Sequence, residues 1–515
     1  MTAIGITASP VRRGPSVAEQ FLCSGSDNAA ILRILVLFVA AWTAFQTMAY
    51  SSVALHPDLT EIFVWSQHLS ASYYKHPPLG ALMAAAWFSV FPVADWSFHL
   101  LAMTNTAIGL FFTDLIARRY LDRDKRVFVL LFLMLTPFYQ FHGQRFASNQ
   151  TLISTWPLAT WCFLKSFERR GIAWPAAAGV AAALAMLGKY FSIYLIAAFP
   201  VAVLVHRDGL SYLRSPAPWI SIVAGLLVLS PHLVWLAANG PQPLSYAASV
   251  HGNIGFDHAL AKSGSFLLGL IGYAALPSAV YWLVIRPERS TIREIITPPD
   301  SGRRMLLALF LVPLLLPAIV SPLLETSLTP LWTMQAWFLL PILLLAPRPA
   351  VLPRRAMILT ATCVFLATVT LAAAAPLIAW RYHTDGIGQD RAYAHLLATE
   401  TAREWRERFD TKLNIVTGEP NLASAATFYS SGHPDYVPVV GLPTSPWVTT
   451  RRLASEGAAI LCRADERIAC EWGARALGTP EQALQKTEIT LASHYLGSTT
   501  RPQKFLMWFL PPDGR

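Results

Sequence analysis

Charged residues are scarce in this sequence. Asp, Glu, Lys and Arg make up 14% of its 515 residues, whereas a soluble protein has about 25%. Hydrophobic residues account for 54%. This composition predicts a polytopic α-helical membrane protein and argues against a soluble globular one.

Several catalytic motifs are also missing. The sequence contains no Walker loop, no Gly-x-Ser-x-Gly elbow, no His-Glu-x-x-His and no dinucleotide fingerprint after a strand. The five cysteines show no metal-ligand spacing, so no metal site is expected. Cys462 and Cys470 lie close together in a polar region, and whether they pair depends on the redox state of the compartment that this region faces.

The basic residues that are present follow a pattern. The net charge is +10, but Lys and Arg fall in short clusters between apolar runs: 118–126, 169–170, 207–214, 286–304 and 348–355. Such clusters are typical of cytoplasmic loops. A nucleic-acid-binding protein gathers its basic residues on one folded face, so no nucleic-acid partner is expected.

Runs of about 20 apolar residues predict about eleven transmembrane helices: 31–50, 97–117, 127–141, 149–167, 173–188, 190–206, 217–238, 264–285, 305–320, 331–347 and 356–379. With residues 1–30 as a cytoplasmic tail, this order places every basic cluster on the cytoplasmic side. Two further helices, 59–70 and 78–91, are predicted to lie on the membrane surface, in a first periplasmic loop that spans 51–96.

The last part of the sequence is more polar. After the membrane domain, 31–380, residues 381–515 are predicted to form a small periplasmic α/β domain. Strand-like stretches occur at 413–417, 436–440 and 458–462, with a helix-like run at 422–429.

The first loop contains two acidic residues at helical spacing. Asp58 and Glu61 lie three residues apart, so they share one face of a helix that begins near Pro57. One interpretation is that a carboxylate at this position is stabilised by the positive N-terminal end of the helix dipole. The other is a general base at the membrane surface, where partial desolvation raises the proton affinity of a carboxylate.

A group of polar and aromatic residues follows in the same loop. Tyr74, Lys75 and His76 precede two prolines, and this set suits a lipid-borne phosphate, with a cation for charge and a phenol for hydrogen bonds. The alternative is an interfacial aromatic belt with a snorkelling lysine. Further candidates lie near the outer ends of later helices: Arg145, Asn149, Lys189, His232 and Glu325.

These residues resemble a known family. Asp58-Leu59-Thr60-Glu61, Trp65-Ser66-Gln67 and Tyr73-Tyr74-Lys75-His76-Pro77-Pro78-Leu79 resemble the polyprenyl-phosphate-sugar-dependent glycosyltransferases of the GT-C fold, in particular the dolichyl-phosphate-mannose-protein mannosyltransferase-like proteins. That group includes aminoarabinose transferases of lipid A and rhizobial lipopolysaccharide galacturonosyltransferases. Supporting matches are Arg145–Asn149, Leu187–Tyr190 and Pro231–Trp235.

The resemblance implies a reaction and a set of roles. Asp58, with Glu61 nearby, would deprotonate the acceptor hydroxyl, which attacks a sugar carried on polyprenyl phosphate. Tyr74, Lys75, His76, Arg145 and Lys189 would bind the donor phosphate or lipid. Asn149, His232 and Glu325 would contact the sugar or the acceptor, which is lipopolysaccharide, lipid A, another glycan or a protein. No cofactor is implied beyond this lipid-linked donor, and the implied location is a bacterial inner membrane.

The sequence departs from the family pattern at three positions. Leu59 replaces a second acid, His76 stands where many relatives have lysine, and Asn149 replaces a carboxylate. Two other classes therefore remain as alternatives, a transporter or flippase of a lipid-linked sugar and a catalytically silent assembly subunit. The transporter class predicts two similar halves and charges near the membrane midplane.

Overall fold

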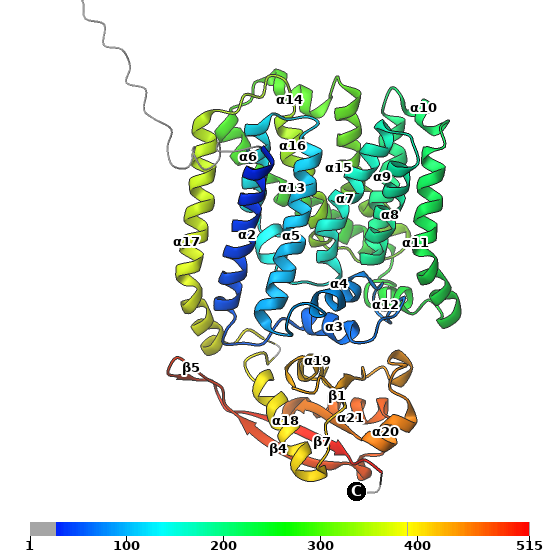
Figure 1. Ribbon diagram of the computed structural model, residues 1–515, viewed down its shortest axis with the longest axis vertical. Helices are drawn as coiled ribbons and strands as arrows, with labels where there is room; N and C mark the ends of the chain where they lie inside the picture. Colours follow the sequence, from blue (N-terminus) through cyan, green and yellow to red (C-terminus); the bar gives the residue numbers. More distant parts are fainter. Residues whose placement is uncertain (1–26, 389, 514–515) are drawn as a thin grey trace, which may run out of the picture.

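The computed structural model describes residues 27–388 and 390–513, and it has two parts (Figure 1). A bundle of helices forms the upper part, and a smaller domain with a β-sheet lies beneath it. The end of the bundle that faces this domain is called the domain end, and the opposite end the far end. Residues 1–26 of the predicted tail lie outside the described residues, and residues 27–30 already belong to the first helix.

The bundle confirms the predicted class of polytopic helical membrane protein. Six of its described helices are long and apolar enough to cross a membrane: α2 (Asp27–Ala49), α5 (Asp95–Ala117), α11 (Ala217–Asn239), α13 (Phe256–Ile285), α15 (Ser301–Leu323) and α17 (Arg354–Asp385). In α11, α13 and α17 most apolar side chains are exposed, as expected for helices that contact lipid.

The other five predicted spans are not among these six: one is a continuous 21-residue helix with more polar residues, and the other four are shorter or interrupted. They correspond to α7 (Ser148–Glu168), α8 (Ala173–Gly188), α9 (Ile193–Leu204) with η2 (Tyr190–Ser192), α6 (Arg123–Met134) with η1 (Phe138–His142), and η3 (Pro330–Ala336) with α16 (Leu339–Leu345). Pro137 and Pro330 stand where helical segments begin, because proline lacks the N–H that would continue a preceding helix. Single uninterrupted helices at 127–141 and 331–347 were therefore a wrong prediction.

The basic clusters gather at the far end. Figure 1 shows α10 (Gly209–Leu213) and α14 (Arg289–Ile296) there, next to the connections between neighbouring helices. A buried ion pair joins α5 to α6 on this side. Asp114, which is fully buried, accepts from Arg118 Nε at 2.9 Å and from Arg126 Nε at 2.9 Å.

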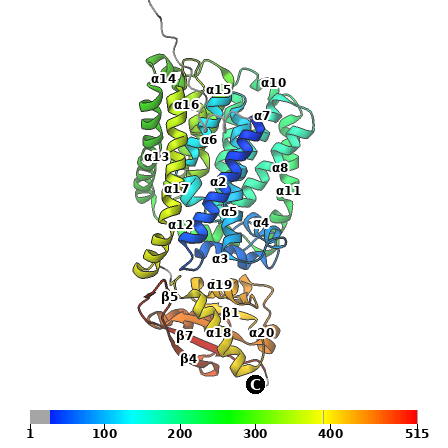
Figure 2. The same cartoon turned by 60° about the vertical axis from the view of Figure 1, so that its left-hand side comes forward.

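The two surface helices of the first loop are present at the domain end. They are α3 (Pro57–Ser66) and α4 (Leu79–Phe88), and both views show them between the bundle and the lower domain (Figures 1 and 2). The helix α12 (Gln242–His251) lies at the same level. The loop between α3 and α4 carries Tyr74, Lys75 and His76.

The lower domain has an α/β fold, as predicted. Its sheet has the strand order β2-β1-β3-β7-β4; the first three strands are parallel, and β7 is antiparallel to both β3 and β4. Its elements are α18 (Ala394–Phe409), β1 (Ile415–Gly418), α19 (Pro420–Tyr429), β2 (Asp435–Tyr436), η4 (Leu442–Thr444), α20 (Thr450–Glu456), β3 (Ala458–Arg463), η5 (Ala464–Glu466), α21 (Arg467–Ala476), η6 (Glu481–Ala483), β4 (Gln485–Leu491), β5 (His494–Tyr495), β6 (Ser498–Thr499) and β7 (Gln503–Leu510).

Some details of this domain differ from the sequence prediction. The strand predicted at 436–440 is only Asp435–Tyr436, because Pro438 cannot donate to a sheet ladder and a turn follows it. The last membrane helix continues to Asp385, six residues past the predicted end. Cys462 on β3 and Cys470 on α21 form a disulfide in the structure, a pairing that the sequence left open.

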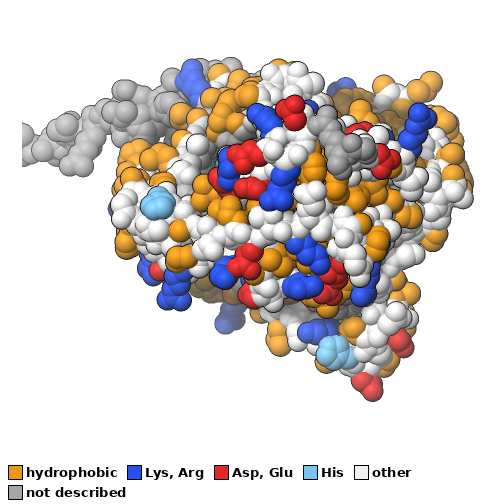
Figure 3. Space-filling model, turned by 90° about the horizontal axis from the view of Figure 1, so that it is seen from below, with side chains coloured by type: hydrophobic (Ala, Val, Ile, Leu, Met, Phe, Trp, Pro, Cys, Tyr) orange, Lys and Arg blue, Asp and Glu red, His pale blue; other side chains and the backbone are white. Residues whose placement is uncertain are grey.

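The first loop is held between the two parts of the molecule. Thr60 on α3 bonds Ser424 on α19 at 3.0 Å, and the Leu55 N–H donates to the Tyr429 hydroxyl at 2.7 Å. His68 Nε2 lies 2.5 Å from Asp435 at the start of β2. Seen from the domain end, the outer surface mixes basic, acidic and hydrophobic side chains (Figure 3).

Candidate active site

The start of α3 places Asp58 at the junction of the bundle and the lower domain. His56 is the N-cap residue, and its Nδ1 accepts from the Asp58 N–H at 3.3 Å. Pro57 occupies the first helical position, where its missing N–H costs nothing. The Asp58 side chain is 52% exposed, and its Oδ2 lies 3.5 Å from His56 Nδ1. Asp58 is therefore a carboxylate that an incoming group can reach.

Glu61, one turn further along, is engaged by Lys75. Lys75 Nζ donates to Glu61 Oε1 at 2.5 Å, and both side chains are about four-fifths buried. Burial opposes the charged form of Lys75, but Glu61 outweighs it and raises the pKa of the ammonium, with Asp58 adding to the rise. Lys75 is therefore held as a cation, and the carboxylate that remains open is Asp58.

Aromatic rings surround the Lys75 ammonium. Its Nζ lies 5.5 Å from the ring centres of both Tyr74 and Tyr246, the second of which comes from α12. Burial raises the pKa of Tyr74, so its phenol stays protonated and is able to donate a hydrogen bond. These residues line a cavity of about 530 Å³ together with Tyr436 and Thr444 of the lower domain. We call it the Tyr246 cavity.

His76 is a neutral residue in this setting. Burial is the main reason, and the charges of Lys189 and Lys75 add to it, lowering the pKa of His76 to about 3. His76 therefore contributes no positive charge at neutral pH. This chain thus has an uncharged imidazole directly before the two prolines.

Lys189 lies directly after α8, at the domain end of the bundle. Its Nζ donates to Asn149 Oδ1 at 2.6 Å and lies 4.7 Å from the centre of the Trp332 ring. Asn149 stands near the start of α7 and thus orients the ammonium without neutralising it. Lys189 and Lys75 both act on the pKa of His76, so the structure brings these two cations into one neighbourhood.

Two other predicted site residues, His232 and Glu325, have different surroundings. His232 on α11 is buried, its Nε2 lies 2.9 Å from the Tyr190 hydroxyl and its Nδ1 2.9 Å from the Ala71 carbonyl. Its Nδ1 thus ties α11 to the first loop, and its Nε2 ties α11 to η2. Glu325 has an exposed side chain at the end of α15, and its carbonyl accepts from the Ile254 N–H at 3.1 Å.

A second cavity borders α3 on the side of its N-cap. Its volume is about 370 Å³, and it contains Arg145, from the connection between η1 and α7, and Arg391, from the link to the lower domain. The other lining residues are Tyr50, His56, Leu59, His99, Gln144, Tyr382, Ile387 and Gly388. We call it the Arg391 cavity.

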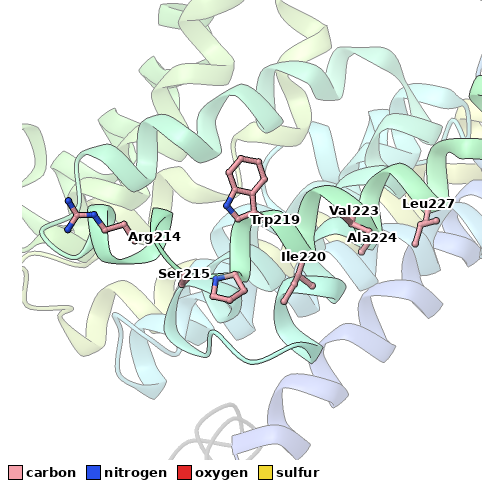
Figure 4. Close-up of a pocket in the computed structure, with 8 residues that line it drawn as sticks. Arg214, Ser215, Trp219, Ile220, Val223, Ala224 and Leu227 are labelled. Carbon is pink, nitrogen blue, oxygen red and sulfur yellow. The ribbon is translucent and has the colours of Figure 1, made fainter.

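Sequence reasoning missed Tyr246 and Arg391. Neither stands in a motif, and each reaches the site only through packing of segments that lie more than 150 residues from the first loop. The larger recess of about 620 Å³ along α11 is a different feature (Figure 4). It lies near the far end, where α11 begins, and its wall is mostly apolar, with Arg214 at one end and Leu227 at the other.

Comparisons with known proteins show similarity in sequence and in fold. A family described as dolichyl-phosphate-mannose-protein mannosyltransferase matches residues 75–235, a stretch that begins at Lys75 and does not include Asp58. The lipopolysaccharide core galacturonosyltransferase RgtA of Rhizobium johnstonii is 25% identical over 265 residues, which cover 49% of this chain and 50% of that protein. The matching part thus spans about half the length of this relative.

The solved structures that resemble this chain extend over nearly all of it. ArnT from Cupriavidus metallidurans bound to undecaprenyl phosphate has a TM-score of 0.60 at 14% identity, over 93% of this chain and 97% of ArnT. The apo state of the same protein gives 0.58 at 12% identity, over 94% and 98%. The chain therefore has the GT-C membrane fold. The three comparisons together show that part of this chain is similar in sequence to that mannosyltransferase family and to RgtA, and that nearly all of it is similar in fold to ArnT.

Proposed function

We propose that this protein is an inverting glycosyltransferase that moves a sugar from a polyprenyl-phosphate donor to a cell-envelope acceptor, at the periplasmic face of a bacterial inner membrane. The observation that carries the proposal is the surroundings of α3. An open carboxylate, Asp58, is close enough to Lys75 and Lys189 to act electrostatically on both, and both lysines are held in place by polar partners. Similarity to RgtA and ArnT supports the donor and acceptor classes.

The proposed reaction uses each of these groups once. The Asp58 carboxylate takes the proton of the acceptor hydroxyl, and the oxygen then attacks the anomeric carbon of the donor sugar. The bond between that carbon and the phosphate oxygen breaks, and polyprenyl phosphate leaves from the opposite face. Lys75 and Lys189 stabilise the negative charge that grows on the departing phosphate.

Two features support a periplasmic site. The disulfide between Cys462 and Cys470 is typical of a domain in an oxidising compartment. The basic clusters lie at the far end of the bundle, which suits a cytoplasmic side. Asp58 and the lower domain share the other end.

The test is Asp58→Asn in purified full-length protein, with a polyprenyl-phosphate-linked sugar as donor. Because the amide is not a base, we expect kcat to fall by about 10²-fold or more, while undecaprenyl phosphate still binds. Asp257→Asn is the matched control, since Asp257 is an exposed acid at the start of α13. We expect this control to keep its turnover.

The two alternative functions predict a different effect of Asp58→Asn. A flippase or a silent assembly subunit does not need a general base, so its activity in lipid translocation or assembly would survive Asp58→Asn. Wild-type protein that transfers no sugar from a panel of hexose, uronic acid and aminoarabinose donors would also refute the proposal.

A further inference from the structure

The Arg391 cavity has the composition of an anion site. Two guanidinium groups and two imidazoles line it, and none of its described lining residues is acidic. Arg391 is only 7% exposed. A buried arginine without a carboxylate partner is costly unless an anion completes the site.

The Arg391 side chain is held firmly but keeps donors available. Its Nε donates to the Ala54 carbonyl at 2.7 Å, and its guanidinium lies 5.4 Å from the centre of the Tyr50 ring. Among the described residues, its two terminal nitrogens have no hydrogen-bond partner. Arginine binds phosphate or carboxylate through two parallel N–H groups, so these two nitrogens suit such a ligand.

Two buried polar atoms in the same wall also lack partners. His99 Nδ1 and Gln144 Oε1 have no hydrogen-bond partner, although these residues are only 5% and 6% exposed. Gln144 itself is fixed, because its Nε2 donates to the Tyr50 hydroxyl at 2.9 Å. Buried polar groups are rarely left unsatisfied, so the residues of this wall have hydrogen-bonding capacity that the described residues do not meet.

The position of the cavity connects it with the proposed reaction. His56 lines the cavity and lies 3.5 Å from Asp58, so the cavity opens beside the proposed base. Lys75 lines the separate Tyr246 cavity and Lys189 lies in its neighbourhood, so the donor phosphate already has two cations. The acceptor hydroxyl also has to reach Asp58, so an anion site next to Asp58 suits the acceptor.

We propose that the Arg391 cavity binds a phosphate or carboxylate group of the acceptor, and that Arg145 and Arg391 thereby select acceptors with such a group beside the attacking hydroxyl. This inference rests on the proposed function. It also assigns a role to the lower domain. The Ala54 N–H donates to the Arg391 carbonyl at 2.9 Å, so docking of the domain onto the first loop completes the acceptor site.

The test measures lipid binding to full-length protein in nanodiscs. The first three probes are possible acceptors: lipid A, whose anionic groups are phosphates; lipid A with these phosphates removed; and deep-rough lipopolysaccharide, which adds carboxylates. The fourth probe is undecaprenyl phosphate.

The variants are Arg391→Gln and Arg145→Gln. Arg145 is exposed, so its variant stays informative if loss of Arg391 impairs folding. The control is Arg381→Gln, an exposed arginine paired with Asp385 on α17.

We expect both variants to bind charged lipid A or lipopolysaccharide about tenfold more weakly or worse, with undecaprenyl phosphate unaffected. Wild-type protein should prefer charged to dephosphorylated lipid A if phosphate is the group, and lipopolysaccharide to lipid A if carboxylate is. Equal binding of all three acceptor lipids by wild-type protein would overturn the inference. So would an equal loss of undecaprenyl phosphate binding in the variants, because the cavity would then hold the donor phosphate. Failure of wild-type protein to bind undecaprenyl phosphate would instead count against the proposed function.

Discussion

At the residue scale, the two acids of the first loop have separate environments. Asp58 is half exposed beside His56, and Glu61 is largely buried against Lys75. Their spacing alone made them equivalent candidates. In the proposed mechanism Asp58 is the base because its carboxylate is open, and Glu61 is a positioning residue that acts through Lys75.

The role of Glu61 leads to a prediction about pH. In Glu61→Gln the carboxylate that raises the pKa of Lys75 is gone, while burial still disfavours the charged ammonium. The alkaline limb of the kcat/KM profile should therefore move to lower pH by about one unit or more. We also expect kcat/KM at neutral pH to fall by about tenfold.

The measurement compares this variant with Glu404→Gln, which changes an acid on α18 in a surface network with Arg403 and Arg408. The control should reproduce the wild-type profile. An alkaline limb of Glu61→Gln that superimposes on the wild-type curve would show that Glu61 does not act through Lys75.

At the element scale, close helix packing fixes the position of Lys189. The helices α8 and α11 cross where Gly179 faces Gly225, and a Cβ built on Gly179 would lie 2.0 Å from the Ser221 carbonyl oxygen. Helices in membranes often approach at such small residues. The same α8 ends at Lys189, and α11 carries His232, which bonds to the first loop.

Gly179→Ala should therefore push α8 and α11 apart. We expect the free energy of unfolding to fall by an amount on the order of 1–3 kcal/mol, because the added methyl group would clash with backbone atoms that cannot move away. The measurement is the apparent Tm in detergent. Gly171→Ala is the control, since a Cβ there meets no atom within 4 Å. Equal Tm values for the two variants would contradict the proposed crossing.

At the scale of the whole molecule, the lower domain acts as one wall of the site. Tyr436 and Thr444 line the Tyr246 cavity, and Arg391 lines the other one. His68 and Arg452 both contact Asp435, and together they outweigh burial and lower the pKa of this carboxylate. The charged Asp435 thus helps to hold the first loop against the domain.

The orientation of this domain can be checked through its disulfide. If the domain is periplasmic, Cys462 and Cys470 are oxidised in cells, and a maleimide-polymer reagent should label neither after denaturation without reductant. Reduction should then add two labels, and the Cys462→Ser/Cys470→Ser double variant should lose this difference. Identical labelling with and without reductant would place the domain in a reducing compartment.

The sequence by itself determined the elements that depend on local hydropathy and turn residues. Apolar runs located the bundle and α3 and α4, and the strand and helix at 415–429 were recognised within two residues of their bounds. It also located Asp58, Lys75 and Lys189, because polar residues at a membrane surface stand out from their apolar neighbours.

Only the tertiary structure decided how distant segments meet. The contact of Arg391 with Ala54, the ring of Tyr246 over Lys75 and the engagement of His232 by Ala71 each join segments more than 150 residues apart. The strands β4 and β7 were missed for a related reason, since their side chains become buried or exposed only when the sheet forms against its neighbours. Local pattern specifies which face of an element is apolar, whereas packing specifies what that face meets.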